Sequence, residues 1–147
     1  MNHPAELALH KYMSDASSGA SDMSEDTIRQ VGQDVMDALR KQFGKQDKRK
    51  FSLRMSNVGR PTCQLWYDKN KPEVAVAKSN TFVMNMMIGD IVEAVFKGLL
   101  TEAGVKYEDT KKVSLDLPST SISGSYDIVI GDAVDDIKSA SDWSYRN

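Results

Sequence analysis

Two aspartates and a lysine near the end of the sequence have the spacing of a divalent-metal site. The run from Ser123 to Ala140 reads SGSYDIVIGDAVDDIKSA, and Gly131-Asp132 separates two stretches rich in β-branched residues. A two-residue loop that begins with glycine predicts a β-hairpin with a type II′ turn. In the register that this turn sets, Asp127 faces Asp136, and Lys138 lies on the same face as Asp136.

The chemistry expected of this arrangement follows from its charge. Directly opposed side chains have Cβ atoms roughly 4.5 to 5.5 Å apart, and two like charges so placed destabilise a sheet unless a cation lies between them. Mg²⁺ and Mn²⁺ prefer hard oxygen ligands, and Mg²⁺ usually takes one or two carboxylates together with water and substrate phosphate. The spacing therefore predicts a Mg²⁺ (or Mn²⁺) site. The alternative is an ordinary hairpin with a solvated acidic face.

A G-x-x-D strand followed by D-I-K-S on the next strand resembles the PD-(D/E)XK nucleases, and most closely their RecB-type, CRISPR-associated and phage exonuclease branch. The matching stretches are Gly124 to Asp127 and Asp136 to Ser139. The resemblance implies that the two aspartates and the Ile137 carbonyl bind the metal ion. It also implies that Lys138 orients the attacking water or stabilises the developing negative charge.

The longest predicted helix carries a further candidate. Asn80 to Ala103 is apolar on two faces, which is typical of a helix buried between other elements. Within it, Gly89 to Glu93 reads GDIVE and resembles the G-x-x-x-[HE] motif of the same family. That resemblance implies that Glu93 is a further metal ligand or a group that positions water. The alternative partner of Glu93 is Lys97, in the favourable i, i+4 arrangement.

Positive charge gathers in one segment. From Arg40 to Arg60 there are eight basic residues against Asp47 alone, an excess of seven. A basic segment beside an acidic pocket is what a metal-dependent nuclease needs, because one holds phosphates and the other holds the metal. A solvated surface is the alternative. The candidate nucleic-acid contacts are Lys48, Arg49, Lys50, Arg54 and Arg60, the last of these on the resemblance alone.

The segment after Arg60 carries the single cysteine and two aromatic residues. In the iron–sulfur members of the resembled group, a cysteine in this place joins three others, and a cluster needs about four thiolates. Cys63 alone cannot form one, so it remains only a remote candidate in a longer assembly and is expected to be a small buried residue. Trp66 and Tyr67 could stack on bases, but core packing is the favoured prediction.

The elements that must position these residues follow from periodicity and capping. Residues 1–21 lack an apolar period and are expected to be mostly disordered, with a short helix around Ala5 to Tyr12 as an open alternative. Residues 22–147 form the predicted domain. Its expected elements are a helix that Asp22 or Ser24 caps and Gly44 ends, a short strand at Phe51 to Met55, a helix from Pro61 or Thr62, the long helix, a strand at Val113 to Leu117, and the hairpin.

This order predicts an α/β (α+β) domain with a central mixed sheet, helices that flank the catalytic hairpin, and, from the resemblance, a restriction-endonuclease-like core. The composition, 40% apolar and 27% charged, is that of a soluble globular protein without a transmembrane run, and one cysteine fits a reducing cytoplasm. Nine residues follow Lys138, whereas a parallel crossover needs a dozen or more. We therefore expect a core that is incomplete at its C-terminal side.

The predicted function is a metal-dependent DNA exonuclease, phage-encoded and used in recombination or DNA degradation in the host cytoplasm. Its predicted partners are DNA and either a complementary C-terminal fragment or further copies of the chain. Two alternatives stay open. One is half of a split nuclease that is inactive without its partner fragment, and the other is a DNA-binding module without turnover.

Overall fold

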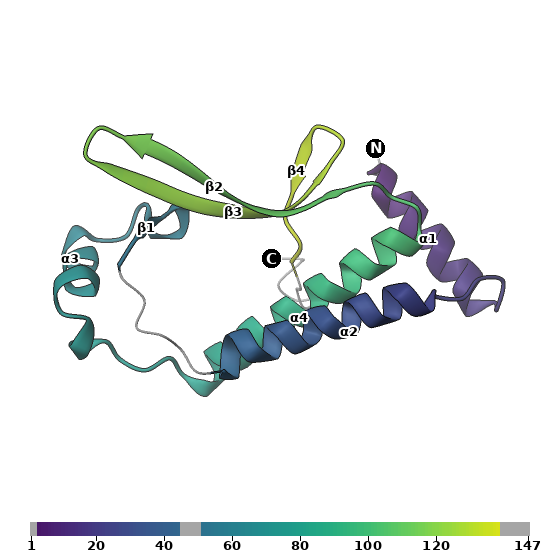
Figure 1. Cartoon of the computed structure of the whole chain (residues 1–147), viewed down its shortest axis with the longest axis horizontal. Helices are drawn as coiled ribbons and strands as arrows, with labels where there is room; N and C mark the ends of the chain where they lie inside the picture. Colours follow the sequence, from purple (N-terminus) through teal and green to yellow (C-terminus); the bar gives the residue numbers. More distant parts are fainter. Residues whose placement is uncertain (1–2, 45–50, 139–147) are drawn as a thin grey trace, which may run out of the picture.

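A computed structural model describes residues 3–44 and 51–138 of the chain. It is a mixed α/β structure with an elongated shape (Figure 1). The helices are α1 (Pro4–Ser17), α2 (Glu25–Phe43), α3 (Thr62–Asn70) and α4 (Asn80–Glu102), with short 3-10 helices η1 (Met55–Asn57) and η2 (Pro72–Val74). The strands are β1 (Leu53–Arg54), β2 (Glu108–Leu117), β3 (Thr120–Ile130) and β4 (Ala133–Asp135).

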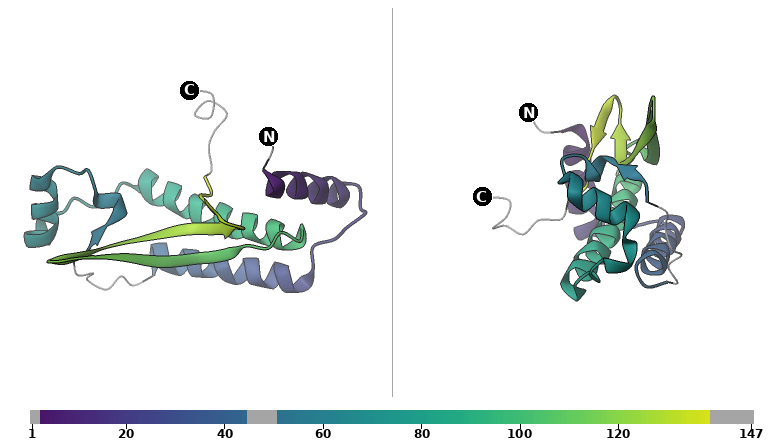
Figure 2. Two further views of the ribbon diagram at one scale, coloured as in Figure 1. Left: turned by 90° about the horizontal axis from the view of Figure 1, so that it is seen from above. Right: turned by 90° about the vertical axis from the view of Figure 1, so that its left-hand side faces the viewer.

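Helices α2 and α4 pack side by side along the length of the molecule, and the sheet lies on one side of this pair (Figures 1 and 2). The start of α2 is fixed by Ser24, as predicted, because its hydroxyl accepts a hydrogen bond from the Thr27 N–H at 3.3 Å. The Ser24 and Thr27 hydroxyls then donate to Glu102 at the end of α4. These contacts join the first turn of α2 to the last turn of α4, so the two helices are antiparallel.

The N-terminal segment corrects one expectation. Where residues 1–21 were expected to be mostly disordered, the structure has helix α1. His3 caps this helix, since its Nδ1 accepts a hydrogen bond from the Ala5 N–H at 3.3 Å. The residues Ala5, Leu9 and Tyr12 recur at helical spacing and are buried, the first two against Leu100 of α4 and Ile128 of β3. Burial of these apolar side chains stabilises α1, although the composition of the segment is mostly polar.

Strand β3 is the centre of a four-stranded mixed sheet. The antiparallel β2 pairs with nearly the whole of β3. Because β2 occupies one edge, the parallel β1 at Ile122 and Ser123 and the antiparallel β4 at residues 128–130 must share the other edge. Among the described residues, no strand pairs with that edge between these two points, along the stretch from Gly124 to Asp127.

The predicted hairpin register is found in the structure. Ile130 pairs with Ala133, and the ladder continues to Ile128 opposite Asp135. Gly131 has φ of 62°, whereas no non-glycine residue of the described chain, Asp132 included, has positive φ. Positive φ at the first loop residue alone is the type II′ pattern. Strand β2 begins at Glu108, earlier than the predicted Val113, and turns directly into β3.

Several large apolar side chains lie outside the small buried core. Trp66 and Tyr67 on α3 are about half exposed and contact each other edge to face, with ring centroids 5.2 Å apart, so the prediction that they pack in the core is wrong. Cys63 is exposed as well, which corrects its expected burial. The accessible surface is 11606 Å², against about 7,500 Å² for a compact monomer of this mass. Among the helices described, none has the length and apolarity to cross a bilayer.

Candidate functional site

The structure brings the side chains of Asp127 and Asp136 together. Asp127 lies on β3, and the chain that leaves β4 after Asp135 runs back beside it. The Ile137 N–H donates a hydrogen bond of 2.9 Å to Asp127 Oδ2, and the two carboxyl groups lie close enough for each to shift the pKa of the other. The predicted juxtaposition is therefore present, although the strand ladder itself ends one residue earlier, at Asp135.

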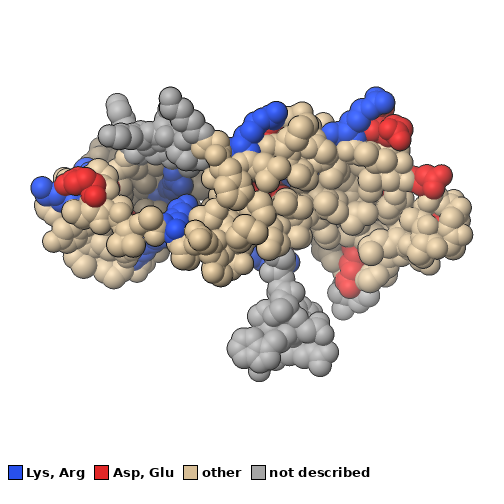
Figure 3. All heavy atoms as spheres, turned by 90° about the horizontal axis from the view of Figure 1, so that it is seen from below, with Lys and Arg blue, Asp and Glu red and all other residues tan. Residues whose placement is uncertain are grey.

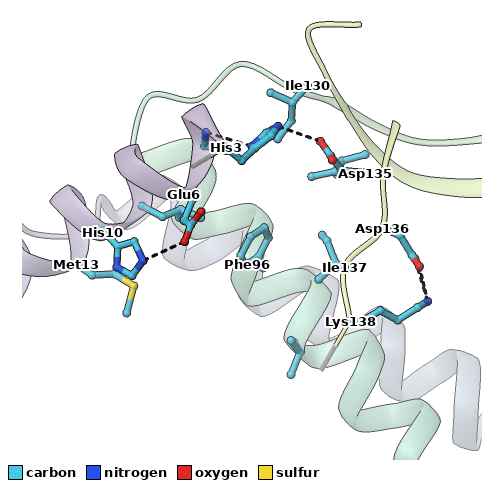
Figure 4. Close-up of a pocket in the computed structure, with 14 residues that line it drawn as sticks. His3, Glu6, His10, Met13, Phe96, Ile130, Asp135, Asp136, Ile137 and Lys138 are labelled. Atoms are coloured by element: carbon cyan, nitrogen blue, oxygen red, sulfur yellow. Dashed lines mark hydrogen bonds and ion pairs between the residues drawn. The ribbon is translucent and has the colours of Figure 1, made fainter. Parts of the chain in front are cut away.

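Side chains alternate between two sides of the segment from Asp135 to Lys138 (Figure 4). Ile137 points toward Phe96 and packs against the core, and Asp135 lies 3.8 Å from His3 Nε2 on the same side. These residues line an apolar groove of about 480 Å³ between α1, α4 and the sheet. The side chains of Asp136 and Lys138 point to the other side, where Lys138 Nζ is 2.9 Å from the carboxylate, and both residues border the same groove at its edge. The Lys138 side chain is 75% exposed, so its ammonium is accessible to a ligand.

The two aspartates titrate differently because their surroundings differ. Burial raises the pKa of Asp127, and the hydrogen bond with Asp136 and the nearby charges of Glu93 and Asp136 raise it further, against the lowering effect of the Ile137 N–H. The hydrogen bond from Lys138 lowers the pKa of Asp136, followed by the hydrogen bond with Asp127. Of the two carboxyl groups, Asp127 is therefore the one that protonates first as the pH falls.

Glu93 lies near this pair without joining it in one ligand set. Its Oε1 accepts a hydrogen bond of 2.6 Å from Lys97, the alternative partner that the sequence offered. The Thr110 hydroxyl lies 3.3 Å from the same oxygen and 3.0 Å from the Asp127 carbonyl oxygen, which links α4 to β3. Over the described residues, no three His, Cys, Asp or Glu side chains lie close enough to hold one metal ion.

Lys97 on α4 donates hydrogen bonds to two residues at the start of β2. Its Nζ lies 2.6 Å from Asp109 and 2.8 Å from the Thr110 hydroxyl, and its side chain is only 11% exposed. Burial alone would lower the pKa of Lys97, but the hydrogen bonds to Asp109 and Glu93 outweigh burial and raise it. Sequence analysis missed Asp109 and Thr110, because no local pattern shows which β2 residues meet α4.

The five predicted nucleic-acid contacts have different outcomes. Arg54 lines a polar groove of about 570 Å³ beside the sheet. Arg60 lies outside this groove, in the turn before α3, where its N–H donates to the Asn57 carbonyl at 3.1 Å. Lys48, Arg49 and Lys50 lie outside the described residues. Seen from below, Lys and Arg atoms border a hollow in the half of the molecule that carries α3 and β1 (Figure 3).

No protein-family model, curated protein or solved structure matched the chain.

Proposed function

We propose that the chain is a Mg²⁺-dependent (or Mn²⁺-dependent) deoxyribonuclease of the PD-(D/E)XK type that acts as an exonuclease. The observation that carries the proposal is the contact between the carboxyl groups of Asp127 and Asp136, with Lys138 ion-paired to the second. Two acids and a lysine on the end of a hairpin are the residue types that metal-assisted phosphodiester hydrolysis requires. A phage-encoded enzyme at work in the host cytoplasm is the setting we propose.

The residues present fit a hard divalent cation. Both side chains offer carboxylate oxygens, and a cation bound between them would relieve their mutual repulsion. Asp127, Asp136 and the Ile137 carbonyl would hold the ion. Bound there, Mg²⁺ would supply Lewis acidity toward a phosphoryl oxygen and lower the pKa of water.

The remaining roles belong to side chains of this chain. The hydrogen bond with Asp136 raises the pKa of Lys138, so the lysine is fully charged at neutral pH and can stabilise negative charge that develops on phosphate oxygens. Glu93, held by Lys97, adds negative charge close to Asp127 and orders the Thr110 hydroxyl. We assign Glu93 a positioning role for water or for the pair.

The test is cleavage of end-labelled linear DNA with Mg²⁺ or Mn²⁺, with EDTA as the negative control. We expect release of short products by the wild-type chain and loss of activity in Asp136→Asn, which removes one charge and almost no volume. Asp116→Asn, an equivalent change on exposed β2, should leave the rate unchanged. Metal-independent cleavage, or full activity in Asp136→Asn, would refute the proposal.

A second candidate is a DNA-binding module, or one half of a split nuclease, that gains activity only with a partner. The observation that favours it is the large apolar surface of the described chain, including the exposed Val113, Leu115 and Leu117 on one face of β2. A complementary C-terminal fragment or a second copy could cover such a surface. This candidate predicts DNA retention in EDTA without cleavage in Mg²⁺, whereas the nuclease predicts cleavage by the chain alone.

A further inference from the structure

A polar groove lies between the β1–η1 segment and the β2–β3 ladder, next to the paired aspartates. Its basic residues are Arg54 from β1 and Lys112 from β2. No carboxylate of the residues that the structure describes lines the groove. Hydroxyl groups form much of the remaining wall and come from Ser52, Ser56, Thr110, Ser123 and Ser125. Cations and hydroxyl donors without acids are the groups that bind phosphate oxygens.

Both groove cations lack ion-pair partners among the described residues. Lys111, the neighbour of Lys112 in β2, instead forms an ion pair with Glu108. Successive residues of a strand point to opposite faces, so Lys111 points away from the face that Lys112 presents to the groove. Among the described residues, no carboxylate neutralises the positive charge of the groove, which is therefore available to an anion.

The groove leads along β3 to the proposed metal site. Lys112 pairs with Ser125 across the ladder. Asp127 is two residues further on the same face, about 6.6 Å along the strand. The Thr110 hydroxyl lines the groove and also donates to the Asp127 carbonyl oxygen. A chain of phosphates lying over Ser125 would thus have its next phosphate beside Asp127.

Gly124 fixes the wall of the groove that carries Arg54. A Cβ atom at Gly124 would lie 2.9 Å from Met55 Cγ, so any larger residue would require the Met55 side chain at the start of η1 to move. The Ser123 hydroxyl adds a hydrogen bond of 3.4 Å to the Leu53 carbonyl. The glycine of the G-x-x-D stretch thus has a physical role, which is to leave room for Met55, next to Arg54, against the strand that carries Asp127.

We propose that this groove binds the sugar–phosphate backbone of the DNA strand to be cut, with Arg54 and Lys112 on successive phosphates upstream or downstream of the scissile bond. This inference rests on the proposed nuclease function and adds the path of the substrate strand. It assigns Lys112, which sequence analysis did not single out, as a substrate-binding residue.

The test is the binding of a fluorescein-labelled single-stranded 12-mer in EDTA, followed by anisotropy over a range of salt concentrations. We expect Lys112→Ala to weaken binding roughly fivefold or more and to reduce the salt slope by about 0.7, the value for one lost phosphate contact on a single strand. Arg54→Ala should behave alike. Lys111→Ala is the matched control, with the same loss of charge on the opposite face, and should change affinity less than twofold.

Equal weakening by Lys111→Ala and Lys112→Ala, or an unchanged salt slope in Lys112→Ala, would overturn the groove assignment. Thermal unfolding of each variant checks that it is folded. Cleavage assays in Mg²⁺ separate the two proposals. Binding specific to Lys112 without cleavage by the wild type would retain the groove and refute the nuclease. Cleavage together with equal effects of the two lysines would retain the nuclease and refute the groove.

Discussion

Gly98 and Gly89 on α4 provide a matched pair of substitutions with opposite expected signs. Alanine in place of glycine stabilises a helix interior by about 0.8–1 kcal/mol. A Cβ atom at Gly89 would have no neighbouring atom within 4 Å, so Gly89→Ala should show this full gain. At Gly98 the same Cβ would lie 2.4 Å from the Val31 Cγ2 methyl of α2, at least about 1 Å inside carbon–carbon contact distance.

The clash at Gly98 outweighs the gain in helix propensity. Val31 is β-branched and has one preferred helical rotamer, so its methyl cannot rotate away cheaply. Overpacking costs about 1–3 kcal/mol, and an overlap this large belongs near the upper end. The net loss for Gly98→Ala is then about 1–2 kcal/mol. In thermal unfolding followed by circular dichroism, Tm should fall by about 2–8 °C, whereas Gly89→Ala should raise it by about 2–4 °C.

A double variant tests the cause. In a Val31→Ala background the obstructing methyl is absent, so Gly98→Ala should cost less there than in the wild type, with a coupling free energy of about 0.5–3 kcal/mol. Equal stabilisation by Gly98→Ala and Gly89→Ala, or zero coupling with Val31, would refute the close packing of α2 on α4.

Three further outcomes follow from the electrostatics. Hydrogen bonds from Ser24 and Thr27 lower the pKa of Glu102 from the ordinary 4.5, so the unfolded state binds more protons around and below that pH. The stability advantage of wild type over Glu102→Gln in urea unfolding should therefore vanish as the pH falls from about 4.5, and a constant difference would contradict this. Lys97→Met should lower the free energy of unfolding by about 1–3 kcal/mol, because the Lys97 side chain is only 11% exposed. Lys111→Met should lower it by less than about 0.5 kcal/mol, because the ion pair of Lys111 is exposed. Equal losses would contradict a stabilising role for the Lys97 contacts. In EDTA at pH 7, Asp127→Asn should raise stability by about 0.2–1 kcal/mol, because one of two adjacent like charges is lost; a lower Tm would contradict this.

The features predicted correctly from sequence are those that local residues determine. The turn at Gly131 sets the hairpin register, and the periodicity from Asn80 onward sets helix α4. Asp127 and Asp136 are nine residues apart in a tight hairpin, so their proximity needs no knowledge of the rest of the fold. For the same reason, the alternation of side chains along a strand was enough to predict that Asp136 and Lys138 lie on one face.

The features missed depend on contacts between distant segments. The apolar stripe of α1 is recognisable only once Leu100 and Ile128 are known to receive it. Whether the Glu93 carboxylate contacts Lys97 or the pair of aspartates depends on where β2 crosses α4. Lys112 is one of several polar residues in β2, and no local pattern distinguishes it from the others. Its proposed role follows only from the position of β1 at the opposite edge of β3.

The most direct test of the proposed metal site is Mn²⁺ binding by the Asp127–Asp136 pair, measured as the rise in Tm when Mn²⁺ is titrated into metal-free protein at pH 7. A ligand at a hundred times its Kd stabilises by about 2.7 kcal/mol, which corresponds to about 5–11 °C for a chain of this size. We predict that rise in the wild type and in Asp116→Asn, and none in Asp136→Asn. The same rise in Asp136→Asn would place the metal elsewhere and contradict the proposed site.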